Sequence, residues 1–163
     1  MAVRMQLSRI LIRELVDFQI IELREMLDDG ETGETGQAGE ARTFPIVIGL
    51  PEAQAIERRL SGITIKRPQT HDLLGSIIRE MGGHLEKIEI TDLSEHTFFA
   101  ELEVLRDDGS VVKIDSRPSD AIALGIATGT PIWVAEHVLE SATAPDYAED
   151  EEDDSDEDEG YEL

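Results

Sequence analysis

Residues 84–116 constrain the fold most, because three runs of alternating apolar and polar residues follow one another with short turns between them. The runs are "HLEKIEITDL" (84–93), "HTFFAELEVL" (96–105) and "SVVKIDS" (110–116). A period of two is typical of strands with one buried face, and Asp108-Gly109 is a hairpin turn signal. We therefore predict antiparallel strands here, with the first turn at Ser94-Glu95.

Helices are predicted at three places where a strand-like run meets proline or a capping residue. "TFPIVIGL" (43–50) reads as a buried strand, and the helix after it has Pro51 in its first turn. Thr70 is the expected N-cap of the second helix. The predicted helices cover residues 51–62, 70–83 and about 118–128. "TPIWVAEHVL" (130–139) is predicted as a final strand, with a helical end left open.

The N-terminal segment is ambiguous by pattern alone. Residues 5–27 fit either two strands or one long amphipathic helix, because Leu, Arg, Glu and Met dominate them. Residues 28–43 are rich in glycine and acidic residues, so an exposed loop is expected. With the other elements, this predicts an α+β fold: a mixed, largely antiparallel sheet with about three helices.

Charge divides the chain into a predicted domain (1–141) and a predicted tail (142–163). The formal net charge is −23, and residues 146–163 carry 12 acidic and no basic side chains. Such a composition does not bury enough apolar surface to fold, so a disordered tail is expected, with a partner that the sequence leaves unknown. The rest of the chain is also acidic, so any nucleic acid would need a local basic patch or a metal ion.

Several classes of protein are excluded or disfavoured. The chain has no cysteine, which excludes disulfides and cysteine-ligated metal sites. The apolar runs are shorter than the roughly 20 residues of a membrane-spanning helix. Arg4, Arg9 and Arg13 interrupt the N-terminal apolar stretch, so no signal peptide is expected. A soluble cytoplasmic protein without membrane contact is the default expectation.

Two dense groups of polar residues lie beside predicted helix starts. They are Arg67, Thr70, His71 and Asp72 in the first, and Asp115, Ser116, Arg117, Ser119 and Asp120 in the second. Free N–H groups at a helix start favour phosphate oxygens. Simple helix capping by the Ser, Thr and Asp residues is the competing interpretation. Glu52, after Pro51, is a third polar position of this kind.

Capping accounts less readily for Asp115 and Arg117. Asp115 ends a strand and Asp120 follows a proline bend, so both carboxylates are candidates to bind one Mg²⁺ or Mn²⁺. Arg117 is a candidate phosphate ligand, or else the ion-pair partner of Asp115 or Asp120. His71 is a candidate general base or metal ligand, or else makes a local hydrogen bond.

Four ordered blocks of the sequence resemble the bifunctional nuclease family. They are "FPIVIGLPEAQAI", "RPQTHDLLGSII", "HTFFAEL" and "IDSRPSDAIALGIATGTPIWVAEHVLE", within residues 4–140. The resemblance implies that the N-terminal segment forms strands and that the substrate is RNA or DNA. The predicted acidic loop is longer than the family pattern, and the tail lies outside it.

The resemblance raises the expectation that the two polar groups share one site, without assigning roles. As hypotheses, Asp115 and Asp120 bind the cation that activates water, and His71, oriented by Asp72, acts as the base. Arg117 neutralises transition-state charge, while Arg67, Thr70, Ser116 and Ser119 bind substrate. A non-catalytic interaction module and a small nucleotide phosphohydrolase are the alternatives. A homodimer is expected, because a small sheet often leaves an edge or face to cover.

Overall fold

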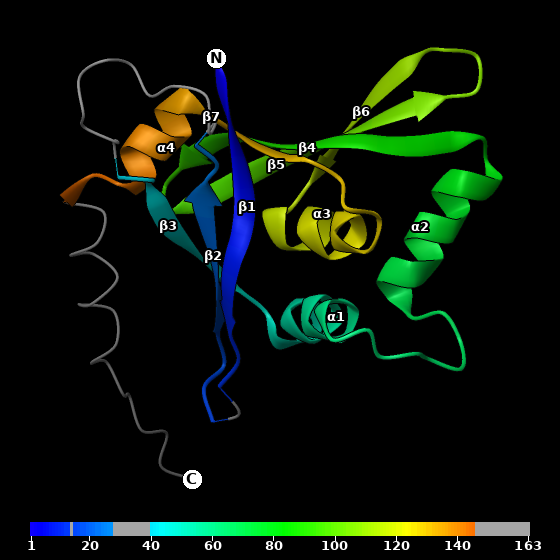
Figure 1. Cartoon of the computed structure of the whole chain (residues 1–163), viewed down its shortest axis with the longest axis horizontal. Helices are drawn as coiled ribbons and strands as arrows, with labels where there is room; N and C mark the ends of the chain where they lie inside the picture. Colours follow the sequence, from blue (N-terminus) through cyan, green and yellow to red (C-terminus); the bar gives the residue numbers. More distant parts are fainter. Residues whose placement is uncertain (14, 28–39, 146–163) are drawn as a thin grey trace, which may run out of the picture.

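The computed structural model describes residues 1–13, 15–27 and 40–145, and this part of the chain forms one seven-stranded sheet with four α-helices (Figure 1). The strands are β1 (Ala2–Leu11), β2 (Gln19–Glu25), β3 (Thr43–Ile48), β4 (Gly83–Ser94), β5 (Thr97–Arg106), β6 (Val111–Ser116) and β7 (Ile132–Ala135). The helices are α1 (Leu50–Leu60), α2 (Thr70–Glu80), α3 (Pro118–Gly125) and α4 (Glu136–Ala142), with the short 3-10 helix η1 (Ile126–Thr128) after α3. The predicted α+β class is confirmed.

The sheet is mixed but mostly antiparallel. Its strand order is β3-β2-β1-β7-β4-β5-β6, and only β4 and β7 run parallel. The β4–β5–β6 meander has the predicted antiparallel pairing. β1 and β2 pair antiparallel, which confirms that the N-terminal segment is strands.

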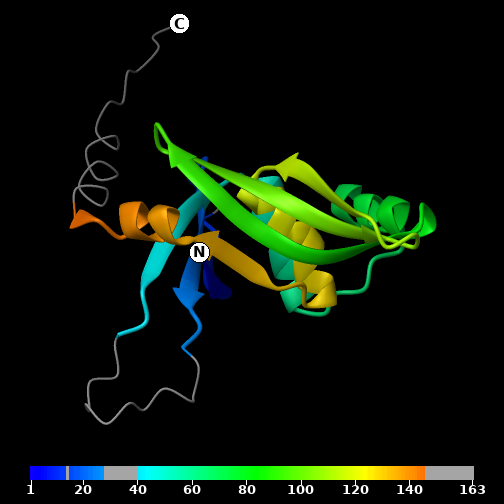
Figure 2. The same cartoon turned by 90° about the horizontal axis from the view of Figure 1, so that it is seen from above.

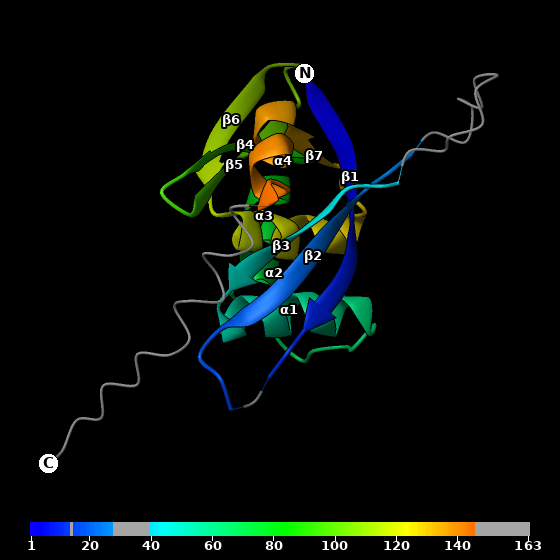
Figure 3. The same ribbon diagram turned by 90° about the vertical axis from the view of Figure 1, so that its left-hand side faces the viewer.

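The sheet curls around a shared core, with α3 and α4 inside the curve (Figure 3). Phe44 of edge strand β3 stacks on Phe98 of β5 with ring centroids 5.5 Å apart. Four strands, β2, β1, β7 and β4, lie between β3 and β5 in the sheet order, so the curl of the sheet brings the two rings together. Alternating buried residues of the strands, such as Ile88 and Ile90 of β4, face this core. Burial of apolar area on this inner face is the main term that stabilises the fold.

Helix α3 packs deepest in the curve. Every residue from Ala121 to Gly125 is buried, so this helix is apolar all round. A Cβ placed on Gly125 would lie 2.5 Å from Cδ1 of the buried Ile88, so a side chain here would force α3 or the Ile88 side chain to move. None of the described helices covers the opposite face of β4, β5 and β6, as Figure 2 shows from above.

The structure corrects one local prediction and decides another that the sequence left open. The β4–β5 turn is centred one residue later, on Glu95 and His96, which have φ values of 48° and 58°. The last strand has the helical end that the sequence left open, because the chain turns into α4 at Glu136. Val138, Leu139 and Ala142 are buried at helical spacing, so the apolar run that suggested a strand is the buried face of a helix.

The predicted loop and tail fall mostly outside the described residues. From the loop prediction (28–43), residues 40–43 are described, and Thr43 begins β3. From the tail prediction (142–163), residues 142–145 are described, and Ala142 is a buried residue of α4. None of the described helices is long and apolar enough to cross a membrane.

Candidate active site

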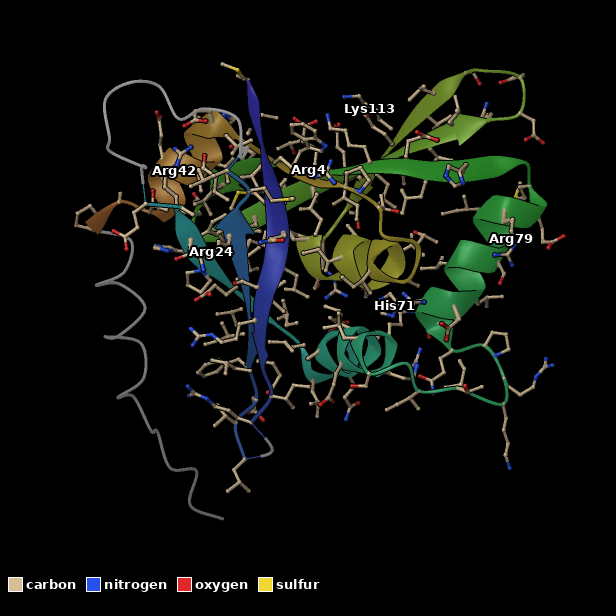
Figure 4. All side chains as sticks on the ribbon, in the orientation of Figure 1. Arg4, Arg24, Arg42, His71, Arg79 and Lys113 are labelled. Atoms are coloured by element: carbon tan, nitrogen blue, oxygen red, sulfur yellow. The ribbon has the colours of Figure 1, made fainter. Side chains whose placement is uncertain are left out.

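Helices α2 and α3 contact each other, which joins the two polar groups. Figure 4 shows His71 at the start of α2, on the side of that helix toward α3. Nε2 of His71, in the first turn of α2, lies 2.9 Å from Oδ1 of Asp120, in the first turn of α3. One turn further along both helices, Gly75 faces Leu124. A Cβ at Gly75 would lie 3.5 Å from Cδ1 of Leu124, an ordinary contact, so α2 and α3 pack together here, one turn from His71 and Asp120.

Asp120 is the centre of the cluster. Its Oδ1 accepts from His71, and its Oδ2 accepts from Nε of Arg117 at 2.7 Å. Partial burial raises the pKa of Asp120, but the bonds from Arg117 and His71 outweigh it and hold the pKa below its ordinary value. The carboxylate is therefore ionised at neutral pH, and both of its oxygens are bonded.

Arg117 joins a third helix start to the cluster. Its Nη2 donates to Oε1 of Glu52, in the first turn of α1, at 2.9 Å. Hydrogen bonds to Asp120 and then Glu52 raise the pKa of Arg117 above its ordinary value. The side chain of Arg117 is 66% exposed, whereas those of Glu52 and His71 are 13% and 11% exposed. Arg117 is thus the member of the cluster that faces solvent, and the ion pair with Asp120 is one of the two alternatives expected from the sequence.

Asp72 does not orient His71, which corrects the role expected for it. Its two oxygens accept from Arg58 at 2.9 Å and Arg59 at 2.8 Å, both at the end of α1. It also accepts from the backbone N–H of Gln69, the residue that caps α2 in place of the predicted Thr70. Burial raises the pKa of Asp72, but the hydrogen bonds from Arg59 and from the Gln69 N–H lower it by more. The pKa of Asp72 therefore lies below its ordinary value. Consecutive helix positions point about 100° apart, so His71 and Asp72 face different helices.

Asp115 lies apart from Asp120. It pairs with Glu101 in the β5–β6 register, on the face of the sheet opposite the buried Leu102. Helix α3, with Asp120, packs on the inner face, so the structure does not bring these two carboxylates to one point. The two serines of the motif have local roles: Oγ of Ser116 donates to the carbonyl of Arg117 at 2.9 Å, and Ser119 is buried.

Arg67 and Thr70 lie exposed at the surface before and at the start of α2. They belong to the segment 58–70, which contains four basic residues and no acidic ones. This segment is a local exception in an acidic chain. It includes Arg58 and Arg59, which the sequence analysis did not single out; adjacent arginines in the last turn of a helix are also what the helix dipole favours.

The donor types of the cluster, two carboxylates and an imidazole, are those that Mg²⁺ or Mn²⁺ accepts. The arrangement differs from a metal site, because the Arg117 guanidinium lies between Glu52 and Asp120 where a cation would bind. No group of three or more His, Asp or Glu side chains in the described part of the chain is placed to hold a metal ion. As arranged, these residues do not fit a metal ion unless Arg117 moves away.

Comparison with known proteins identifies the family. The model of the bifunctional nuclease domain matches residues 36–146, which hold both polar groups and the helices that join them. The chain belongs to this family. Because the match includes α1, α2 and α3, the bifunctional nuclease domain contains every residue of the cluster.

Individual relatives agree with this assignment. Two uncharacterized proteins of Mycobacterium tuberculosis, from strains CDC 1551 and H37Rv, are each 40% identical over 112 residues, covering 68% of this chain and 66% of the relative. Bifunctional nuclease 2 of Arabidopsis thaliana is 25% identical over 99 residues, covering 60% of this chain. The matched region is 30% of that plant protein, so most of the plant protein has no counterpart in the match.

Proposed function

We propose that the chain hydrolyses phosphodiester bonds of RNA or single-stranded DNA at the His71–Asp120–Arg117–Glu52 cluster. The observation that carries this proposal is the 2.9 Å contact between His71 and Asp120, which unites the two motifs that resemble the nuclease family. Membership in the bifunctional nuclease domain family supports the class of reaction.

The geometry suggests a role for each member. Arg117, the exposed member, contacts the scissile phosphate and neutralises charge in the transition state. When Arg117 turns toward the phosphate, it leaves Asp120 and uncovers the His71–Asp120 pair. Nδ1 of His71, the ring nitrogen that does not contact Asp120, then takes a proton from the attacking water, while Asp120 fixes the tautomer of the imidazole and stabilises its charged form. As the water oxygen bonds to phosphorus, the P–O bond to the leaving group breaks. The leaving oxygen takes a proton from solvent, and the imidazolium returns its proton to solvent. Glu52 holds Arg117 in place before substrate binds.

The basic segment 58–70 offers a path for the nucleic acid next to this cluster. Long-range repulsion from an acidic protein is screened beyond about 8–10 Å at physiological salt. Short-range contacts from Lys66 and Arg67 then act on the phosphates, which agrees with the substrate-binding role expected for Arg67 and Thr70.

We propose that a divalent ion, Mg²⁺ or Mn²⁺, can assist the reaction, although the residue roles given above do not depend on it. Such an ion would take the place of Arg117 beside Asp120. Arg117 would then be free to bind substrate, so the metal-bound and metal-free forms would use the same residues. Dependence of cleavage on the ion decides whether this exchange occurs.

The test is cleavage of labelled single-stranded RNA and DNA by the wild type and by Asp120→Asn, with Mn²⁺ and with EDTA. Asp107→Asn, in the turn between β5 and β6, is the matched control. Loss of cleavage in Asp120→Asn alone supports the site. Equal cleavage by all three proteins would assign the activity to another site or to a contaminant.

A non-catalytic interaction module is the second candidate, and one observation favours it. The charges of Glu52, Arg117 and Asp120 satisfy one another, so the cluster serves as a clamp between three helices without any substrate. Under this alternative the wild type leaves RNA and DNA intact in every buffer, and Asp120→Asn changes only stability.

We propose a homodimer on the evidence of α2. Only His71 of this helix is buried, while Leu73, Leu74 and Ile77 are 43–52% exposed and the adjoining Met81 is 81% exposed. Apolar residues gathered on one helix are typical of an interaction surface. We also propose that the protein is cytoplasmic.

A further inference from the structure

A pocket of about 440 Å³ lies against α2, beside the cluster but separate from it. One stripe of α2 lines it, with Asp72, Gly75, Ser76 and Arg79 at helical spacing. The start of β4, the end of α3 and η1 supply the other walls. Asp72 and Leu124 line the pocket, so it is built on the two helices, α2 and α3, that also carry His71 and Asp120.

The pocket contains a cation whose hydrogen bonds are incomplete. The side chain of Arg59 is 10% exposed, and its Nη2 donates to Asp72. Its Nη1 is buried and has no hydrogen-bond partner anywhere in the described part of the chain. A buried donor without an acceptor is unfavourable, so an anion in this pocket that reaches Nη1 would supply the missing bond.

The surrounding groups define the chemistry of the ligand. Arg79 and His84 add exposed donors at the rim, with side chains 70% and 73% exposed. Their neighbours Glu80 and Glu86 lie 4.0 and 3.7 Å from them, so an anion at the rim competes with these two exposed carboxylates. The negative charge of Asp72 is already balanced by its two arginine partners. Apolar side chains form most of the remaining wall, namely Ile78, Leu85, Leu124 and Ala127. An apolar wall with a few convergent cationic donors suits a small ligand with a flat apolar body and an anionic end.

We propose that this pocket binds one nucleoside monophosphate unit, with its base against the apolar wall and its phosphate at Arg59 and Arg79. The choice of a nucleotide among small anions rests on the proposed function. The unit is either a free mononucleotide or the nucleotide that flanks the cleaved bond of a longer strand. A single nucleotide carries few charges, so the acidic surface repels it less than it repels a polymer.

Calorimetric titration of the full chain with uridine 5′-monophosphate, uridine and inorganic phosphate tests the inference. Arg79→Gln removes the rim cation, and Ala127→Phe fills the pocket from the exposed η1 segment. Arg106→Gln is the matched control, because Arg106 is exposed and lies outside the pocket. We expect the nucleotide to bind the wild type and Arg106→Gln equally, at least tenfold more tightly than uridine does. Arg79→Gln and Ala127→Phe should each weaken it at least tenfold, while thermal unfolding shows that both variants are folded.

Absence of nucleotide binding to the wild type at millimolar concentration overturns the inference, as does equal binding to wild type, Arg79→Gln and Ala127→Phe. Binding of uridine as tight as that of the nucleotide overturns the anionic part. The cleavage assay separates this result from the proposed function. Cleavage without nucleotide binding supports the proposed nuclease function and contradicts the proposed nucleotide pocket. Nucleotide binding that depends on the pocket, without cleavage, supports the pocket and contradicts the nuclease function. A labelled trinucleotide that competes with the monophosphate shows that the pocket also accepts a unit of a longer strand.

Discussion

His71 and Asp120 are 49 residues apart in the sequence, yet Nε2 of the first lies 2.9 Å from Oδ1 of the second. The contact lies where α2 packs against α3, since Gly75 also faces Leu124 one turn further along each helix. Arg117 then covers Asp120 from the solvent side and ties it to Glu52. The candidate site is therefore a junction of three helix starts, with its cation outermost.

Replacing Arg117 by lysine should separate charge from geometry. Lysine keeps the positive charge but cannot donate from two positions of a planar fork to Asp120 and Glu52 together. If Arg117 binds the scissile phosphate, cleavage should fall by about 10²-fold, the usual effect of losing one transition-state donor. Arg106→Lys is the matched control for the assay. Wild-type rates in Arg117→Lys would remove this residue from the mechanism.

Asp120 should stabilise the fold at neutral pH and lose this effect in acid. Its pKa is lower in the folded than in the unfolded chain, where an aspartate titrates near pH 4. The stabilisation is therefore present above about pH 4 and disappears as the pH falls through the lower folded pKa. Asp120→Asn should lower the free energy of unfolding by about 1–3 kcal/mol at pH 7, the range for hydrogen bonds to charged groups.

Urea unfolding at pH 7 and at pH 3 measures this effect in wild type, Asp120→Asn and Asp107→Asn. The gap between wild type and Asp120→Asn should narrow at pH 3, while Asp107→Asn should resemble the wild type at both values. A gap that stays constant with pH would contradict the assignment of the stabilisation to the ionised carboxylate.

The sequence predicted much of the fold because alternation carries strong information. The β4–β5–β6 meander and the starts of α1 and α3 follow from local patterns, namely period-two runs and proline in a first helical turn. The N-terminal strands needed the family resemblance, since residues 5–27 fit a helix equally well by propensity. The helical end of the last strand, α4, stayed an open alternative because a short apolar run fits a buried strand or a helix face alike.

The sequence predicted some of the residues that gather at the candidate site but not which of them contact one another. Sequence patterns indicate which residues lie near a helix start, but not which direction each side chain takes from it. The expected partner of His71 was its neighbour Asp72, whereas the structure pairs it with Asp120. The expected partner of Asp120 was Asp115, which the strand places on the other face of the sheet. Both outcomes depend on how α2 and β6 pack against α3, and local patterns do not contain this information.

Gly125 should tolerate no side chain. A Cβ at this position would meet Ile88 at 2.5 Å and Thr130 at 3.1 Å, where α3 crosses β4. Gly125→Ala should therefore destabilise the protein by about 1–3 kcal/mol, as overpacked cores do. In Gly75→Ala the new Cβ lies 3.5 Å from Leu124, an ordinary contact, so the gain in helix propensity should keep stability equal or raise it. Thermal unfolding compares the two, and an unchanged midpoint in Gly125→Ala would show that α3 moves to accommodate the methyl group.

The β4–β5 turn should be improvable. Glu95 and His96 both have positive φ, the conformation of a two-residue hairpin turn that Asn-Gly adopts most easily. The double change Glu95→Asn with His96→Gly relieves the strain of positive φ at two residues that are not glycine or asparagine. After the entropic cost of the new glycine, the free energy of unfolding should rise by about 0.5–1 kcal/mol. Glu95→Pro is the opposing variant, because proline fixes φ near −65° and should destabilise the hairpin. Urea midpoints that move the other way for these two variants would contradict the turn geometry.

The exposed side of α2 should decide the oligomeric state. Ile77 and Met81 lie one turn apart and are 44% and 81% exposed, so a partner that covers α2 would bury both. Ile77→Lys with Met81→Lys should convert a dimer to a monomer, because each unpaired charge is costly in a closed interface. Val47→Lys is the matched control, since Val47 is 49% exposed on the edge strand β3. Light scattering after size exclusion measures the mass of each. A wild type that is monomeric at 100 μM would contradict the proposed dimer. A dimer that survives both lysines but separates in Val47→Lys would place the interface at β3 instead of α2.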